Sequence, residues 1–206
     1  MKDNKVFWSR MAKFYNRFTR GKKSATKPYK NLEDHITADL TTDMEVLELA
    51  SGPGTLSNRI ADSCRHVTIT DFSEKMIEEA EKNVIKKNVT FELADATRLQ
   101  ISNSSFDTII IANALHIMPE PKKAIDEIKR VIKKDGLIIC PIFTREKIEH
   151  KYKEYFLEML GFKTFNRWTN ETYIRFLKEN DLEIIKQDTI IGYNFPICYV
   201  VCKKIA

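Results

Sequence analysis

Long apolar runs are absent from this 206-residue sequence, and no stretch approaches the ~20 apolar residues of a membrane-spanning helix. The N-terminus also lacks an apolar run suited to a signal peptide, so we expect a cytoplasmic protein. Cysteine is scarce, and no cluster of Cys and His has the spacing of a metal site, which argues against a bound metal. Cys198 and Cys202 are an even number of positions apart on a predicted strand, so we expect core thiols.

Acidic residues are nearly absent from residues 1–30, which hold ten Lys or Arg and one acid, Asp3. This segment has a local net charge of +9, so the remainder sums to −4 against the total of +5. Its apolar residues recur at helical spacing, which predicts an amphipathic helix with a basic face. Three roles stay open: a helix packed on the domain, a lid over a ligand, and a segment attracted to an anionic membrane surface or to nucleic acid.

The stretch that organises the rest of the chain begins with a short apolar run at 46–49, which predicts a buried strand. A tight turn from Ala50 follows, with glycines at Gly52 and Gly54, and helical spacing begins at Leu56. A strand, a glycine-rich turn and a helix in this order let the backbone approach a ligand closely at a helix N-terminus.

A dinucleotide site would have a third glycine in this turn, but Ser57 occupies that position. Asp71 closes the next predicted strand, 17 positions after Gly54. That spacing is near the ~20 residues expected for a carboxylate that binds ribose hydroxyls. Asp71 also suits a helix N-cap, and the two roles are compatible.

Predicted strands and helices alternate along the chain, which indicates a doubly wound α/β fold of a single domain. The further strands are expected at 66–70, 89–93, 106–112, 137–143, 183–191 and 195–203. The helices are expected at 32–40, 73–87, 122–132, 145–160 and 169–180, with a polar connector at 21–28 and a turn at 135–136.

The order and spacing of the motifs resemble a class I S-adenosylmethionine-dependent methyltransferase of the ubiquinone/menaquinone C-methyltransferase branch. The matching residues are 48–54, 71–72, 95–96, 106–107, 113–116 and 130–137. The resemblance implies a Rossmann-like sheet of seven strands, mostly parallel, with the last strand inserted antiparallel and helices on both faces. The resemblance covers about residues 44–144 and supports a lid at 1–30. We expect the domain to span 31–206, with a helical acceptor-side insertion at 145–170.

The resemblance implies that the chain binds S-adenosylmethionine and releases S-adenosylhomocysteine. In that family the turn containing Ala50, Gly52 and Gly54 approaches the methionine portion, with Glu48 beneath it. Asp71 would accept the ribose hydroxyls. The adenine would lie among Phe72, Met76, Asp95 and Ala96, and Asn113 would lie beside the amino-acid end and the transferable methyl group.

Two residues are candidates for a catalytic role. His116 is the nearby group able to act as a general base at neutral pH, although a structural hydrogen bond is an alternative. Tyr15 matches an N-terminal Tyr-Asp-like element that lies near the cofactor in the family. No nucleophilic side chain is required, because methyl transfer is direct displacement at the S–CH3 bond and depends on positioning.

The acceptor is less well defined by the sequence. Residues 113–116 read Asn-Ala-Leu-His, which differs from the Asn/Asp-Pro-Pro-aromatic tetrapeptide of methyltransferases acting on DNA bases or protein glutamine. We therefore expect a small apolar or amphiphilic acceptor, such as a quinone precursor or a phospholipid head group. Three alternatives stay open: a dinucleotide-dependent oxidoreductase, a sensor that binds the donor without turnover, and an RNA methyltransferase.

Overall fold

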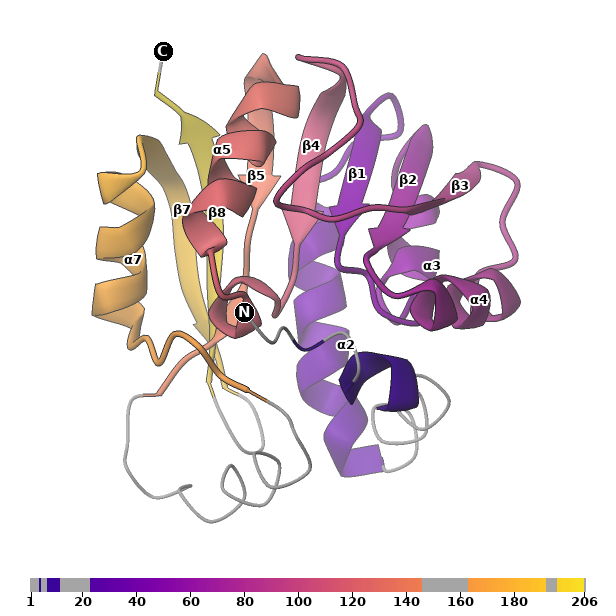
Figure 1. Ribbon diagram of the computed structural model, residues 1–206, viewed down its shortest axis with the longest axis horizontal. Helices are drawn as coiled ribbons and strands as arrows, with labels where there is room; N and C mark the ends of the chain where they lie inside the picture. Colours follow the sequence, from indigo (N-terminus) through magenta and orange to yellow (C-terminus); the bar gives the residue numbers. More distant parts are fainter. Residues whose placement is uncertain (1–3, 5–6, 12–22, 146–162, 192–195, 206) are drawn as a thin grey trace.

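The computed structural model describes residues 4, 7–11, 23–145, 163–191 and 196–205. Its centre is one twisted sheet in the order β3-β2-β1-β4-β5-β8, with β7 paired to the far side of β8 (Figure 1). The bounds are β1 Glu45–Leu49, β2 His66–Asp71, β3 Val89–Leu93, β4 Phe106–Ile111, β5 Ile132–Ile139, β7 Leu182–Ile190 and β8 Ile197–Lys204. A two-residue strand, β6 (Ile142–Phe143), pairs with the start of β8.

The direction of the strands confirms the predicted Rossmann-like sheet. Neighbours among β1 to β5 are parallel, whereas β8 is antiparallel to both β5 and β7. The last strand of the chain is therefore the inserted antiparallel one.

Helices cover both faces of the sheet, as the doubly wound prediction requires (Figure 1). One face packs against α2 (Lys23–Ala38), α3 (Ser57–Ala61) and α4 (Glu74–Asn83). The other packs against α5 (Pro121–Val131) and α7 (Asn170–Glu179), with the short 3-10 helix η1 (Leu115–Ile117) beside β6. Strand β1 serves both cores, because Val46 faces the first helix layer while Leu47 and Leu49 face the second.

Local chemistry accounts for where the second-layer helices begin. Pro121 occupies the first turn of α5, where its missing N–H is not needed. Thr169 caps α7 in a reciprocal pair with Thr172.

Two predictions of local structure were wrong. The expected polar connector at 21–28 is largely helical, since α2 begins at Lys23 and runs past the expected domain boundary at 30/31. Its lysines and Ala25 are good helix formers, and they outweigh the Gly, Ser and Pro signals. The expected turn at 135–136 lies inside β5, where the register against β4 shifts. A Cβ at Gly136 would lie 2.8 Å from the carbonyl oxygen of Asp107, so glycine permits this close approach. Residues 146–160 of the helix expected at 145–160 lie outside the described residues, as does Tyr15, and Arg145 is not helical.

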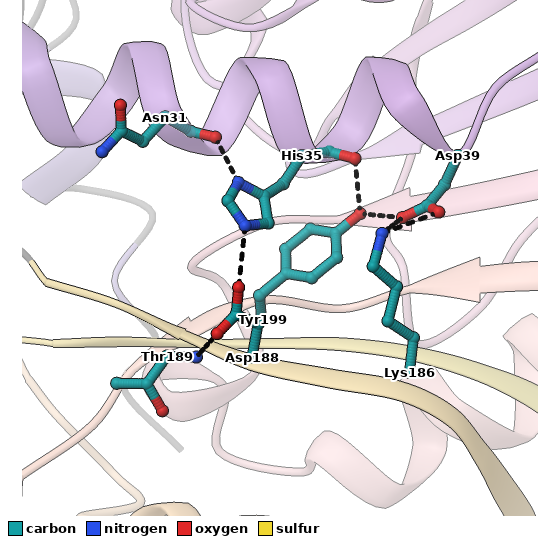
Figure 2. A network of polar contacts seen from close by, with 7 residues as sticks. All are labelled: Asn31, His35, Asp39, Lys186, Asp188, Thr189 and Tyr199. Atoms are coloured by element: carbon teal, nitrogen blue, oxygen red, sulfur yellow. Dashed lines mark hydrogen bonds and ion pairs between the residues drawn. The ribbon is translucent and has the colours of Figure 1, made fainter.

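A polar network fastens α2 to the two C-terminal strands (Figure 2). The two ring nitrogens of His35 lie 2.7 Å from the Asn31 carbonyl oxygen and 3.0 Å from Asp188 Oδ2. Tyr199, on β8, donates its hydroxyl to Asp39 Oδ2 at 2.7 Å, and Lys186 donates to both oxygens of the same carboxylate. His35 therefore has a structural role, because both of its ring nitrogens make hydrogen bonds within the fold.

The described cysteines and helices bear on two of the expectations from the sequence. All four cysteines are buried and none forms a disulfide bond, which agrees with core thiols. No described helix is long and apolar enough to cross a membrane.

Candidate functional site

A cavity of about 320 Å³ opens at the carboxyl ends of β1, β2 and β4, where parallel α/β sheets bind their ligands. Nine of the ten predicted cofactor-binding residues line it: Glu48, Ala50, Gly52, Asp71, Phe72, Met76, Asp95, Ala96 and Asn113. Residues that the sequence reasoning missed include Asn4, Trp8, Thr55, Ile117, Met118 and Glu120.

The tight turn after β1 gives the cavity its floor. Ala50, Gly52 and Gly54 all have positive φ, at 52°, 56° and 74°. No atom lies within 4 Å of a Cβ placed on Gly52, so this backbone faces open space at the cavity. This conformation suits glycine and costs energy at Ala50, a kind of strain that collects at ligand sites.

Gly54 has a different role from the predicted one, because it is not among the residues that line the cavity. A Cβ there would lie 2.6 Å from Val84 Cγ2 and 3.5 Å from the Ala80 side chain. Gly54 therefore lets α4 and the residue after it pack closely against the turn.

Asp71, at the end of β2, holds the turn in place. It is 5% exposed, and its Oδ2 and Oδ1 accept the backbone N–H groups of Gly52 and Ser73, both at 2.9 Å. Burial raises the pKa of Asp71 to about 6, although these hydrogen bonds favour the charged form. Each carboxylate oxygen retains a lone pair for a ligand hydroxyl.

Glu48 is the most deeply buried carboxyl group of the cavity, at 2% exposure. Ser57 donates its hydroxyl to Glu48 Oε2 at 2.5 Å. The residue at the third-glycine position therefore makes a hydrogen bond to this carboxyl group. Burial raises the pKa of Glu48 to about 7, and the charge of Asp71 adds to the increase. A cationic ligand in the cavity would favour the ionised form of both acids.

The adenine side predicted from the resemblance forms one wall. Phe72, Met76, Asp95 and Ala96 all line it. Asp95 Oδ1 accepts the backbone N–H and the hydroxyl of Thr97, at 2.9 and 2.7 Å, which orients this exposed carboxylate.

Two buried polar atoms of residues in the lining have no hydrogen-bond partner: Thr55 Oγ1 and Asn113 Oδ1. Both residues line the cavity. Asn113 is held at φ 53° by a backbone hydrogen bond to the Pro141 carbonyl oxygen, at 2.7 Å. Since buried polar groups are normally satisfied, these atoms indicate where a polar ligand binds.

His116 lies in η1 and is 9% exposed, but it is not among the residues that line the cavity. Its Nδ1 has no partner, and the ring packs edge-on against Phe143, with centroids 6.2 Å apart. Burial, with the charge of Arg145, lowers the pKa of His116 to about 4. The imidazole is therefore neutral at pH 7 and a weak base, so its catalytic role stays a prediction.

The charge of the cavity is of one sign. Among the described residues its lining contains four carboxylates, Glu48, Asp71, Asp95 and Glu120, and no Lys, Arg or His. The whole chain has a net charge of +5, so this acidic lining is a local feature. It favours a cationic or neutral ligand over an anionic one.

Residues 46–136 match the family model described as a methyltransferase domain. Over this stretch the chain is therefore similar to a methyltransferase domain. This match begins at β1 and ends within β5, and so contains the turn, Glu48, Asp71, Asp95 and Asn113.

Curated relatives share 30–41% identity with the chain over the parts that match. A demethylmenaquinone methyltransferase of Clavibacter sepedonicus is 41% identical over 48% of this chain and 41% of its own length. One of Leptospira interrogans is 38% identical over 64% of this chain and 57% of its own. A ubiquinone/menaquinone biosynthesis C-methyltransferase of Rickettsia felis is 31% identical over 59% and 51%. The chain spans about half the length of the curated relatives it matches.

Solved structures share the fold of this chain. Magnesium protoporphyrin IX methyltransferase of Synechocystis, with bound S-adenosylhomocysteine, has a TM-score of 0.76, 17% identity, and coverage of 98% of this chain and 100% of that one. The cyclase SpnF has a TM-score of 0.79 with 15% identity, covering 97% and 95%. At these identities the likeness shows the fold alone.

Proposed function

We propose that this protein transfers a methyl group from S-adenosylmethionine to a small acceptor. The observation that supports the proposal most strongly is the acidic cavity at the strand ends of a methyltransferase domain. The donor is a sulfonium cation with an ammonium group, so Glu48 and Asp71 provide the charge it needs.

The same lining opposes the dinucleotide-dependent alternative. A pyrophosphate would lie in a cavity with four carboxylates and without a described Lys, Arg or His. The turn also has Ser57 in place of the third glycine, and that hydroxyl donates to Glu48. Both features disfavour an anionic cofactor.

The residues of this chain would act by binding and orientation. Asp71 would hold the ribose hydroxyls, and Phe72 with Asp95 would flank the adenine. Thr55 Oγ1 and Asn113 Oδ1 lack partners. At the amino-acid end the Thr55 hydroxyl would donate or accept a hydrogen bond, and Asn113 Oδ1 would accept one. When bound, the donor supplies an electrophilic methyl group, and alignment of the acceptor with the S–CH3 bond provides most of the acceleration.

The acceptor that we propose is a quinone precursor or a similar amphiphilic ring compound. The relatives named as menaquinone and ubiquinone methyltransferases support this choice, although the chain spans only part of them. Trp8, Ile117 and Met118 give one end of the cavity an apolar lining. Phospholipid head groups and RNA are weaker candidates for the acceptor. Two other expectations stay predictions: contact of residues 1–30 with a membrane surface, and a cytoplasmic location.

A donor-binding protein without methyl transfer is the second candidate, because the lining accounts for donor binding while His116, the candidate base, lies outside it. The two are separated by incubating the protein with methyl-labelled S-adenosylmethionine and quinone precursors, phenols, amines, thiols and phospholipid vesicles. Label in one acceptor class supports methyl transfer and identifies the acceptor. Donor binding with no labelled product in any class would favour the second candidate.

A further inference from the structure

One side chain, that of Asn4, joins three parts of the chain that are far apart in sequence. Its Nδ2 donates to the carbonyl oxygens of Ile117 and Lys163, at 3.1 and 2.8 Å. Its Oδ1 accepts the backbone N–H of Lys163 at 2.9 Å. Both donors and one acceptor of the amide are thus satisfied, and Asn4 is only 3% exposed.

The residues after Asn4 extend this contact across the cavity. The backbone N–H of Trp8 donates to the Asn4 carbonyl oxygen at 2.9 Å, and Trp8 lines the cavity. Ser9 Oγ lies 3.0 Å from Ser73 Oγ, and the backbone N–H of Ser73 donates to the Asp71 carboxylate. Figure 1 shows residues 7–11 as a short indigo helix beyond the carboxyl ends of the parallel strands, where the cavity opens. The described N-terminal residues therefore connect the η1 side of the cavity with the Asp71 side.

A second asparagine holds the same wall without Asn4. Asn166 donates its backbone N–H to the His116 carbonyl oxygen and its Nδ2 to the Met118 carbonyl oxygen, both at 3.0 Å. Residues 116–118 are thereby fixed to residue 166, while Asn4 adds the N-terminal residues to this wall. The contribution specific to Asn4 is the placement of Trp8.

We propose that Asn4 is a positioning residue that closes the cavity by holding Trp8 in the lining that it shares with Ile117 and Met118. This proposal rests on the proposed function, which supplies the ligands used in the test. Release of a ligand on this side requires the three side-chain hydrogen bonds of Asn4 to break. Their loss opens the cavity, so bound S-adenosylhomocysteine dissociates faster and the acceptor KM rises.

The test compares Asn4→Asp and Asn4→Ala with the wild type by stopped-flow displacement of S-adenosylhomocysteine. Asn4→Asp has nearly the same shape, but it places a carboxylate against two carbonyl oxygens. We expect the dissociation rate to rise about tenfold or more in both variants. Asn88→Ala is the matched control, because Asn88 Nδ2 also donates to three carbonyl oxygens but lies outside the cavity lining. It should lower Tm and leave the dissociation rate unchanged.

A dissociation rate unchanged in folded Asn4→Asp would overturn the positioning role and leave the proposed function standing. Equal acceleration in Asn4→Ala and Asn88→Ala would also overturn it, because general destabilisation would then account for the effect. A wild-type protein that binds no S-adenosylhomocysteine would overturn the proposed function and this role with it.

Discussion

The buried acid Glu48 should make donor binding depend on pH. Its pKa is about 7 in the empty cavity, against an ordinary value of 4.5, so at pH 6 most molecules hold the proton. A bound sulfonium cation favours the ionised carboxylate, and binding therefore releases this proton. Because the proton leaves on binding, affinity should increase as pH rises through 7.

The size of the effect follows from the fraction of Glu48 that is ionised before binding. If the bound donor returns the pKa of Glu48 to its ordinary value, the affinity is proportional to the fraction of protein in which Glu48 is already ionised. Binding should then strengthen about tenfold between pH 6 and pH 8. Asp71, whose pKa is raised to about 6, adds a smaller dependence at lower pH.

Calorimetric titration of S-adenosylmethionine at several pH values measures this, with Glu48→Gln as the control. Glutamine keeps an oxygen for the Ser57 hydroxyl but does not titrate, and the ionisation of the ligand cancels in the comparison. The variant should lose most of the dependence around pH 7. Equal pH profiles for the two proteins would refute the reasoning.

The same acid predicts a stability effect with a defined sign. Because the pKa of Glu48 is raised in the folded protein, the folded state holds the proton more tightly than the unfolded state. Its contribution is therefore full below about pH 4.5 and is lost as pH rises through 7. Urea unfolding should show Glu48→Gln to be more stable than the wild type at pH 8, by up to ~3 kcal/mol. A difference that is largest at pH 4 instead would contradict this sign.

Three further predictions concern single contacts. Asp71→Ala should weaken donor binding by ~1.5–3 kcal/mol in calorimetry, and unchanged affinity in a folded variant would remove Asp71 from the site. Gly54→Ala should lower the free energy of unfolding by roughly 1–3 kcal/mol, because of backbone strain and the clash with Val84. Adding Val84→Ala should relieve the clash, so the double variant should lose less stability than the sum of the two single variants. Losses that simply add would exclude that clash. Tyr173→Phe removes the hydroxyl that donates to the Cys140 carbonyl oxygen at 2.6 Å and should cost ~1–2 kcal/mol of stability without changing donor affinity; a changed affinity would contradict a purely structural role.

The sequence predicted the sheet and most of the cavity because both depend on local patterns. Apolar runs set the strands, and residues at strand ends such as Asp71 and Asn113 lie together whenever the strands are parallel neighbours. The identity of the turn was predictable for the same reason.

Other features depend on contacts between distant segments, which no local pattern contains. Asn4 lies 113 positions from Ile117 and 159 from Lys163, and a polar residue in a basic segment gives no signal of burial. The packing role of Gly54 depends on Val84, beyond the end of α4. The low pKa of His116 follows from burial in η1, which the short sequence around it did not reveal.

The most direct test of the central claim is a calorimetric titration of the wild-type protein with S-adenosylmethionine, S-adenosylhomocysteine and NADH. We expect the first two to bind at one site and NADH to give no binding, because the cavity is acidic and lacks a described cation for a pyrophosphate. Binding of NADH alone, or no binding of either methionine-derived ligand, would contradict the assignment of this cavity to a methyl donor.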